Sequence, residues 1–283
     1  MEDPVILLEK ILTFAHNDPR IDTVIQTGSR ARNARVDKFS DLDIELIGSG
    51  TDELIGNDLW FKQLGDVMVA LHLANEKEDE PDWPTCLVVF NGGRKVDFTL
   101  ASVKRLKDMK QRGLDELYQR GYKVLLDKTG LTNGLPEITH QLTKSYIPSS
   151  TEFNENLREF WFEATQVPVY ITRGDLWHAR MRDNEMKDLL LAMMEWYVSI
   201  KSDGKTDVWY NGHHLHEWLP EKFSKHIQGI FSSYGKEEAI RALLETTELY
   251  SEISAEVAEM KGFEFDSELP SKVRKHIMQV CYG

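Results

Sequence analysis

Two aspartates and a Gly-Ser turn make one segment of the chain a candidate for metal and phosphate chemistry. Asp41 and Asp43 stand two residues apart in an apolar run, so on a strand both carboxylates project from one face and the apolar neighbours from the other. Paired carboxylates of this kind are ligands for Mg²⁺. Gly28 and Ser29 follow an earlier apolar run and can present backbone N–H groups to a phosphate. Either part alone is usually a surface feature, but together at this spacing they indicate nucleotidyl transfer.

A third carboxylate follows in a predicted hairpin. Residues 86–90 and 95–100 alternate like strands, and Asn91-Gly-Gly93 between them is a strong turn signal. The alternation places Lys95, Asp97 and Thr99 on one face of the second strand. If this strand lies beside that of Asp41, two acids can hold the metal of a triphosphate, and Asp97 can complete the metal site or act as base. A solvent-facing aspartate on an edge strand is the alternative.

The composition limits the classes of partner. Among 283 residues, 41% are hydrophobic and 29% are charged, with a formal net charge of −13. Because nucleic-acid binders usually carry a basic face, we expect no nucleic-acid partner, and the acidity fits a cationic small molecule.

Cysteine usage and hydropathy bear on the compartment. Cys86 and Cys281 lie far apart and offer neither a disulfide framework nor zinc spacing, which favours a reducing compartment. The start of the chain, Met1–Pro4, is acidic, unlike a signal peptide, and no apolar run approaches the length of a membrane span. We therefore expect a cytoplasmic monomer that does not enter a membrane.

The predicted elements change character along the chain, from strands to helices. The first part combines helices at about 3–15 and 103–119 with strands at 21–27, 41–47, 67–71, 86–90, 95–100 and 122–126. Residues 75–84 form an acidic, proline-bearing loop, and 129–150 a connection rich in Gly, Pro, Ser and Thr. Helical periodicity then predicts helices at about 151–172, 175–201, 213–230, 235–261 and 267–281.

The predicted fold class is therefore α+β. A domain over residues 1–140 would hold a mixed sheet flanked by helices, and residues 141–283 would form a helical bundle that binds the acceptor substrate.

The second half is rich in aromatic residues with acids between them. Such residues could bind a polycationic or sugar-like ligand, although for any single residue a place in the bundle core is the better prediction. The tryptophans concerned are Trp161, Trp177, Trp196, Trp209 and Trp218. No other ligand cluster accompanies His213-His-Leu-His216, which we interpret as a helix start with surface histidines or a phosphate contact.

These motifs resemble the nucleotidyltransferase superfamily related to DNA polymerase beta. The longer strings resemble the aminoglycoside 6-adenylyltransferases, bacterial enzymes that transfer AMP from ATP to streptomycin. The matching segments are Gly28-Ser-Arg30, Asp37-Lys-Phe39, Asp41-x-Asp-Ile44, Lys95-Val-Asp-Phe-Thr-Leu100, Val124-Leu-Leu-Asp-Lys128 and Glu159-Phe-Trp161. The resemblance covers nearly the whole chain and is strongest in the first half.

The resemblance implies a role for each matching residue. Asp41, Asp43 and Asp97 would bind Mg²⁺, with Asp97 also the candidate base, and Gly28, Ser29 and Arg30 would hold the triphosphate of ATP. The expected reaction transfers AMP to a hydroxyl of an aminoglycoside such as streptomycin and releases pyrophosphate.

Two alternatives stay open at this point. One keeps the chemistry and changes the acceptor to a lincosamide, another metabolite or a protein hydroxyl. The departures Ala101-Ser102 and Gly212-His-His214, where the family carries Ile-Pro and Gly-Lys, leave the acceptor open. The other is a nucleotide-binding module without turnover, although the presence of all three carboxylates argues against it.

Overall fold

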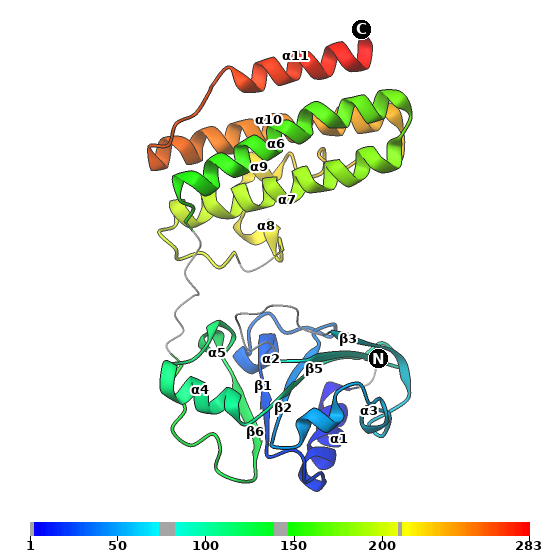
Figure 1. The fold of residues 1–283 in the computed structure, drawn as a ribbon, viewed down its shortest axis with the longest axis vertical. Coiled ribbons are helices and arrows are strands. Elements are labelled where there is room, and N and C mark those ends of the chain that lie inside the picture. Colours follow the sequence, from blue (N-terminus) through cyan, green and yellow to red (C-terminus); the bar gives the residue numbers. More distant parts are fainter. Residues whose placement is uncertain (1–2, 74–82, 139–146, 209–210) are drawn as a thin grey trace. The chain divides into compact units, whose positions relative to one another are not determined.

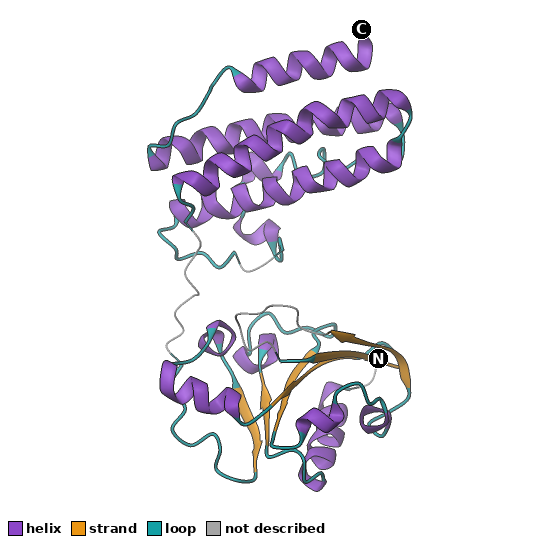
Figure 2. Ribbon diagram, viewed as in Figure 1, coloured by secondary structure: helices purple, strands orange, loops and turns teal. Residues whose placement is uncertain are grey.

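Strands occur only in the first half of the described chain, and helices longer than 20 residues only in the second (Figure 2). The computed structural model describes residues 3–73, 83–138, 147–208 and 211–283. The chain divides into two units, Met1–Thr143 and Lys144–Gly283. The predicted loop at 75–84 lies largely outside the described residues, as do Trp209 and part of the predicted connection at 129–150.

The first unit is built on a six-stranded mixed sheet in the order β3-β4-β5-β2-β1-β6. Only β2 and β5 pair in parallel, and the other neighbours are antiparallel. The strands are β1 (Thr23–Gln26), β2 (Leu42–Ile47), β3 (Val67–Leu73), β4 (Thr85–Phe90), β5 (Lys95–Ala101) and β6 (Lys123–Asp127). Gly92 and Gly93 in the β4–β5 turn both have positive φ, which glycine adopts without strain. The α+β fold class is confirmed, with this mixed sheet in the first half.

Helices cover the sheet on both sides and create two cores (Figure 1). The larger core joins α1 (Pro4–Asn17) and α3 (Leu59–Lys62) to one face of the sheet. The smaller core joins α4 (Lys104–Arg112) and α5 (Glu116–Arg120) to the other face, through Ile25, Ile47 and Ala101. By strand alternation, Ile47 shares its face with Asp43, and Ala101 shares its face with Asp97. The smaller core therefore supports the face that carries the carboxylates. The remaining short elements of this unit are α2 (Gly28–Arg32) and the 3₁₀ helix η1 (Thr51–Leu54).

The second unit is a helical bundle. Its helices are α6 (Ser150–Arg173), α7 (Leu176–Lys201), α8 (Leu215–Trp218), α9 (Glu221–Ser224), α10 (Lys236–Lys261) and α11 (Leu269–Tyr282). A capping box between Ser149 and Glu152 opens α6, and Gly174 ends it in the left-handed conformation. In the core, the rings of Phe160 and Tyr250 stack with centroids 3.4 Å apart.

Two predicted helices are each divided in the structure. The predicted helix at 103–119 ends at Gly113, whose φ of +97° leaves the helical region, and a second helix begins after Asp115. The predicted helix at 213–230 was wrong as one element. Leu219 is extended because a residue before proline avoids the helical conformation, and Pro220 separates α8 from α9.

Among the described helices, none combines the length and apolar character needed to cross a membrane.

Candidate active site

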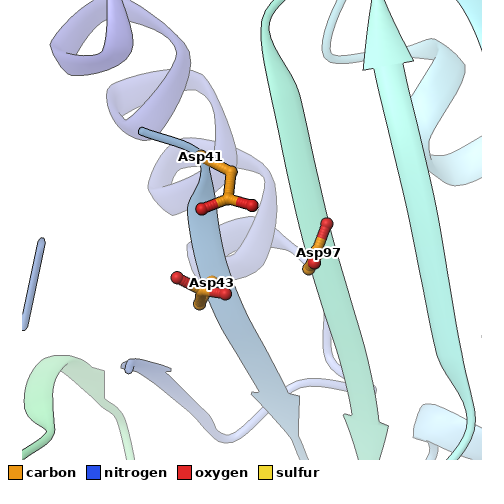
Figure 3. A group of neighbouring side chains, drawn as sticks. All are labelled: Asp41, Asp43 and Asp97. Carbon is orange, nitrogen blue, oxygen red and sulfur yellow. The ribbon is translucent and has the colours of Figure 1, made fainter. Parts of the chain in front are cut away.

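Three carboxylates converge where β2 and β5 run side by side (Figure 3). The parallel register places Asp43 directly opposite Asp97, and Asp41 lies just before the start of β2. One carboxylate oxygen from each aspartate lies within 4.8 Å of the other two. Among the described residues, this is the only group of three or more potential metal ligands with such spacing.

Two arginines fix the loop that carries Asp41. The guanidinium of Arg30 donates to the backbone oxygens of Asp41 at 2.9 Å and of Ser40 at 2.9 Å. Arg94 is buried and also donates to the oxygen of Ser40, at 3.0 Å. The carboxylate of Asp37 accepts from the backbone N–H and the hydroxyl of Ser40. The loop is therefore held from both sides, and its end sets the position of Asp41.

Gly28 lies against Asp43, which explains why a glycine is needed there. A Cβ atom on Gly28 would come within 1.9 Å of Oδ2 of Asp43, and the φ of Gly28 is +67°. The backbone N–H of Thr27 donates to the backbone oxygen of Asp43 at 3.0 Å. Hence the turn that begins α2, with Gly28 and Ser29 as its first residues, packs beside the carboxylates.

The environment of Asp43 and Asp97 disfavours the charged forms of their carboxylates. Burial, together with the charges of Asp41 and Asp97, raises the pKa of Asp43 to about 6. Burial also raises the pKa of Asp97, although its hydrogen bond with Lys95 opposes the shift. Such a site gains stability from any cation that binds between the acids.

The residues fit a divalent cation. Oxygen atoms bound to one octahedral Mg²⁺ are about 2.9 Å apart when adjacent and about 4.2 Å apart when opposite, so carboxylate oxygens within 4.8 Å of one another can close on one ion by side-chain rotation. Oδ1 of Asp97 is buried and has no hydrogen-bond partner among the described residues, which is unfavourable without a cation or donor. Nζ of Lys95 lies 3.0 Å from Oδ2 of Asp41 and 2.8 Å from Oδ2 of Asp97, so a positive charge already lies among these acids.

An ionic network beneath the site was not predicted from the sequence. Glu45, 2% exposed, follows Asp43 on the same face of β2 and binds Arg105 of α4 through two hydrogen bonds of 2.6 and 2.8 Å. The hydroxyl of Tyr118 on α5 donates to Glu45 at 2.7 Å. This network ties both helices to the carboxylate strand. Period-2 alternation already placed Glu45 on this face, but nothing in the sequence indicated its partner 60 residues away.

The structure thus brings together some, but not all, of the site residues predicted from the sequence. Asp41, Asp43 and Asp97 come together, with Gly28 beside them. Arg30 contacts the loop of Asp41 in this structure, and its predicted contact with a triphosphate stays a prediction. Strand alternation placed Lys95 on the face of Asp97 without indicating a role for it, and no sequence pattern pointed to Arg94.

The aromatic residues of the second half belong mostly to the core. Trp161, Trp196 and Trp218 are buried, whereas Trp177 is 75% exposed. His214 precedes α8 and pairs with Glu217, in keeping with a helix start that carries histidines.

Comparisons with known proteins agree on one family. The family model described as streptomycin adenylyltransferase matches residues 1–280. An aminoglycoside 6-adenylyltransferase from Bacillus subtilis (strain 168) is 27% identical over 267 residues, which cover 92% of this chain and 91% of that protein.

Two solved structures are also similar to this chain. The crystal structure of an aminoglycoside 6-adenyltransferase from Bacillus subtilis aligns over all of both chains with 21% identity and a TM-score of 0.46. A STING-associated CdnE c-di-GMP synthase from Capnocytophaga granulosa aligns over 99% of this chain and 81% of that one, with 16% identity and a TM-score of 0.27.

Proposed function

The chain belongs to the streptomycin adenylyltransferase family and is a nucleotidyltransferase, and we propose that it transfers AMP from ATP to a hydroxyl of an aminoglycoside such as streptomycin, releasing pyrophosphate. The observation that carries this proposal is that Asp41, Asp43 and Asp97 place carboxylate oxygens within 4.8 Å of one another, with Gly28 against Asp43.

The roles follow from position. Asp41, Asp43 and Asp97 would hold Mg²⁺, which when bound neutralises charge on the triphosphate and on the leaving pyrophosphate. Gly28 and Ser29 begin the turn beside Asp43, where their backbone N–H groups can bind phosphate oxygens. Asp97, held on β5, would orient the acceptor hydroxyl and take its proton. Arg30 would act by holding the loop of Asp41, as well as by any contact with phosphate.

The two units would have different roles, one in binding the metal and nucleotide and the other in binding the acceptor. All the residues named for metal and nucleotide lie in the first unit, so residues 1–140 would form the nucleotidyltransferase domain. The helical domain, residues 141–283, would bind the acceptor. The net charge of −13 favours the approach of a cationic aminoglycoside over that of an anionic acceptor.

The direct test is an acceptor panel. Purified protein is incubated with Mg²⁺, labelled ATP and, separately, streptomycin, other aminoglycosides and a lincosamide. We expect labelled streptomycin and pyrophosphate. Label on another acceptor alone would refute streptomycin, and ATP binding without pyrophosphate release with any acceptor would refute transfer.

The site is tested with matched variants. Asp41→Ala and Asp97→Ala should each abolish AMP transfer while the circular dichroism spectrum is retained. Asp58→Ala removes an acid of the same unit that pairs with His72 and Lys62, and should keep full activity. Full activity in Asp41→Ala or Asp97→Ala would contradict the site assignment.

A further inference from the structure

Lys95 holds two of the three candidate metal ligands. Its Nζ donates to Oδ2 of Asp41 and to Oδ2 of Asp97, two carboxylates that come from different segments of the chain. Lys95 precedes Asp97 by two residues on β5, so both side chains project from the same face. The lysine side chain is 40% exposed.

This contact differs from the ion pair of Glu45 and Arg105, which involves the same face of the sheet. Arg105 is 11% exposed and grips Glu45 with a planar fork, so it has little freedom to leave. Lys95 carries a compact ammonium on a flexible side chain that is partly exposed to solvent. It can therefore break its hydrogen bonds to Asp41 and Asp97 by side-chain rotation alone. The chain thus has a fixed cation under the site and a movable one within it.

A metal ion and the ammonium compete for the same carboxylates. A divalent cation bound to Asp41 and Asp97 would repel Nζ and would take the lone pairs that Nζ now uses. The nucleotide that accompanies the metal brings phosphate oxygens, which can accept hydrogen bonds from a displaced ammonium.

We propose that Lys95 is an exchangeable counter-ion, which holds Asp41 and Asp97 together before the substrates bind, yields them to the metal, and then contacts the phosphates of the bound nucleotide. This inference rests on the proposed function, because it requires a metal–nucleotide complex at the three carboxylates. It makes Lys95 a positioning residue in the free enzyme and a phosphate contact in the complex.

The test measures metal and nucleotide binding separately. Mn²⁺ is titrated into the full-length protein without nucleotide and followed by electron paramagnetic resonance. A non-hydrolysable ATP analogue is then titrated at saturating Mn²⁺ and followed by calorimetry. In Lys95→Met, the Kd for Mn²⁺ alone should fall about tenfold because the competitor is gone, and the Kd for the analogue should rise about tenfold. Lys95→Arg should restore weak Mn²⁺ binding, since it keeps a cation between the acids.

The controls separate this exchange from a general effect of charge. Lys62→Met removes an ammonium that pairs with Asp58 in the same unit and should change neither Kd. Lys95→Gln repeats the measurement if Lys95→Met does not fold. An unchanged or higher Kd for Mn²⁺ in Lys95→Met or Lys95→Gln would overturn the exchange, even if the wild-type enzyme is active. Absence of Mn²⁺ binding to both wild type and variants would instead overturn the proposed metal site, and the exchange with it.

Discussion

Gly28 and Asp43 are so close that one methyl group decides the geometry of the site. In Gly28→Ala, the new Cβ would meet Oδ2 of Asp43 at 1.9 Å, so the carboxylate must move. We expect AMP transfer to fall about 100-fold or more, because a displacement of about 1 Å of a catalytic group has that effect. The measurement is the initial rate of pyrophosphate release.

Gly56 provides the control for this variant. Its φ of +70° is close to that of Gly28, but nothing lies within 4 Å of its added Cβ. Both variants carry the strain of a left-handed alanine, about 1 kcal/mol, so both should unfold at somewhat lower urea concentration. Only Gly28→Ala should lose activity, and equal loss in Gly56→Ala would show that strain alone is responsible.

Asp43 should make the metal-free protein less stable as the pH rises. Its pKa is raised by burial and by Asp41 and Asp97, from 3.8 to about 6. Between these values the folded protein binds this proton more tightly than the unfolded chain, so stability falls from about pH 4 to about pH 6 and stays low above it. Asp43→Asn removes the effect and should raise the free energy of unfolding by about 2–3 kcal/mol at pH 8 but little at pH 4.

Urea denaturation in the presence of a chelator measures this difference. Asp203→Asn, which changes an acid that is 91% exposed, should show no such dependence on pH. If Asp43→Asn is no more stable than wild type at pH 8, the charged form of Asp43 is not destabilised in the folded protein, and its pKa is not raised. The same variant should lose activity, since it also removes a proposed metal ligand.

At the scale of elements, Glu45 links α4 and α5 to the strand of the carboxylates. Glu45→Gln would leave Arg105, whose side chain is 11% exposed, with Asp115, at 3.0 Å, as its one anionic partner among the described residues. We expect the free energy of unfolding to fall by about 3 kcal/mol, as when one member of a buried ion pair is removed. Glu268→Gln, in an exposed pair with Lys272, should change it by less than about 0.5 kcal/mol, and similar losses in the two variants would contradict the structural role of Glu45.

Features that depend on residues close together in the chain could be predicted from the sequence, whereas contacts between distant segments could not. Strand alternation is local, so it correctly placed Asp43 on one face of its strand and Lys95 and Asp97 on one face of theirs. The parallel pairing of Asp43 with Asp97 joins residues far apart in the chain. Local patterns could not predict that the two strands are neighbours, so the convergence of the three carboxylates depended on that assumption. The hydrogen bonds of Arg94 to the loop of Asp41 also depend on tertiary structure. The break at Pro220 is a local signal, which helical periodicity on either side concealed.

At the scale of the whole molecule, each unit has its own cores. The two cores of the first unit contain only residues of that unit, and the core of the second contains only residues from 153 onward. A chain divided in this way can fold in parts, because no core loses members when the chain is cut at the boundary. The proposed metal and nucleotide residues lie in the first part, so nucleotide binding and acceptor binding should be separable.

We therefore expect a fragment of residues 1–143 to fold cooperatively and to bind Mn²⁺ with an ATP analogue, without transferring AMP to an acceptor. The fragment 144–283 should fold as a helical protein and bind no nucleotide, and only the full chain should label the aminoglycoside. Circular dichroism melts and calorimetry check folding and binding, with Asp97→Ala in the first fragment as the variant that should lose the metal. If the first fragment folds but binds nucleotide far more weakly than the full chain does, the second unit contributes to the nucleotide site, and the division of roles between the units is wrong.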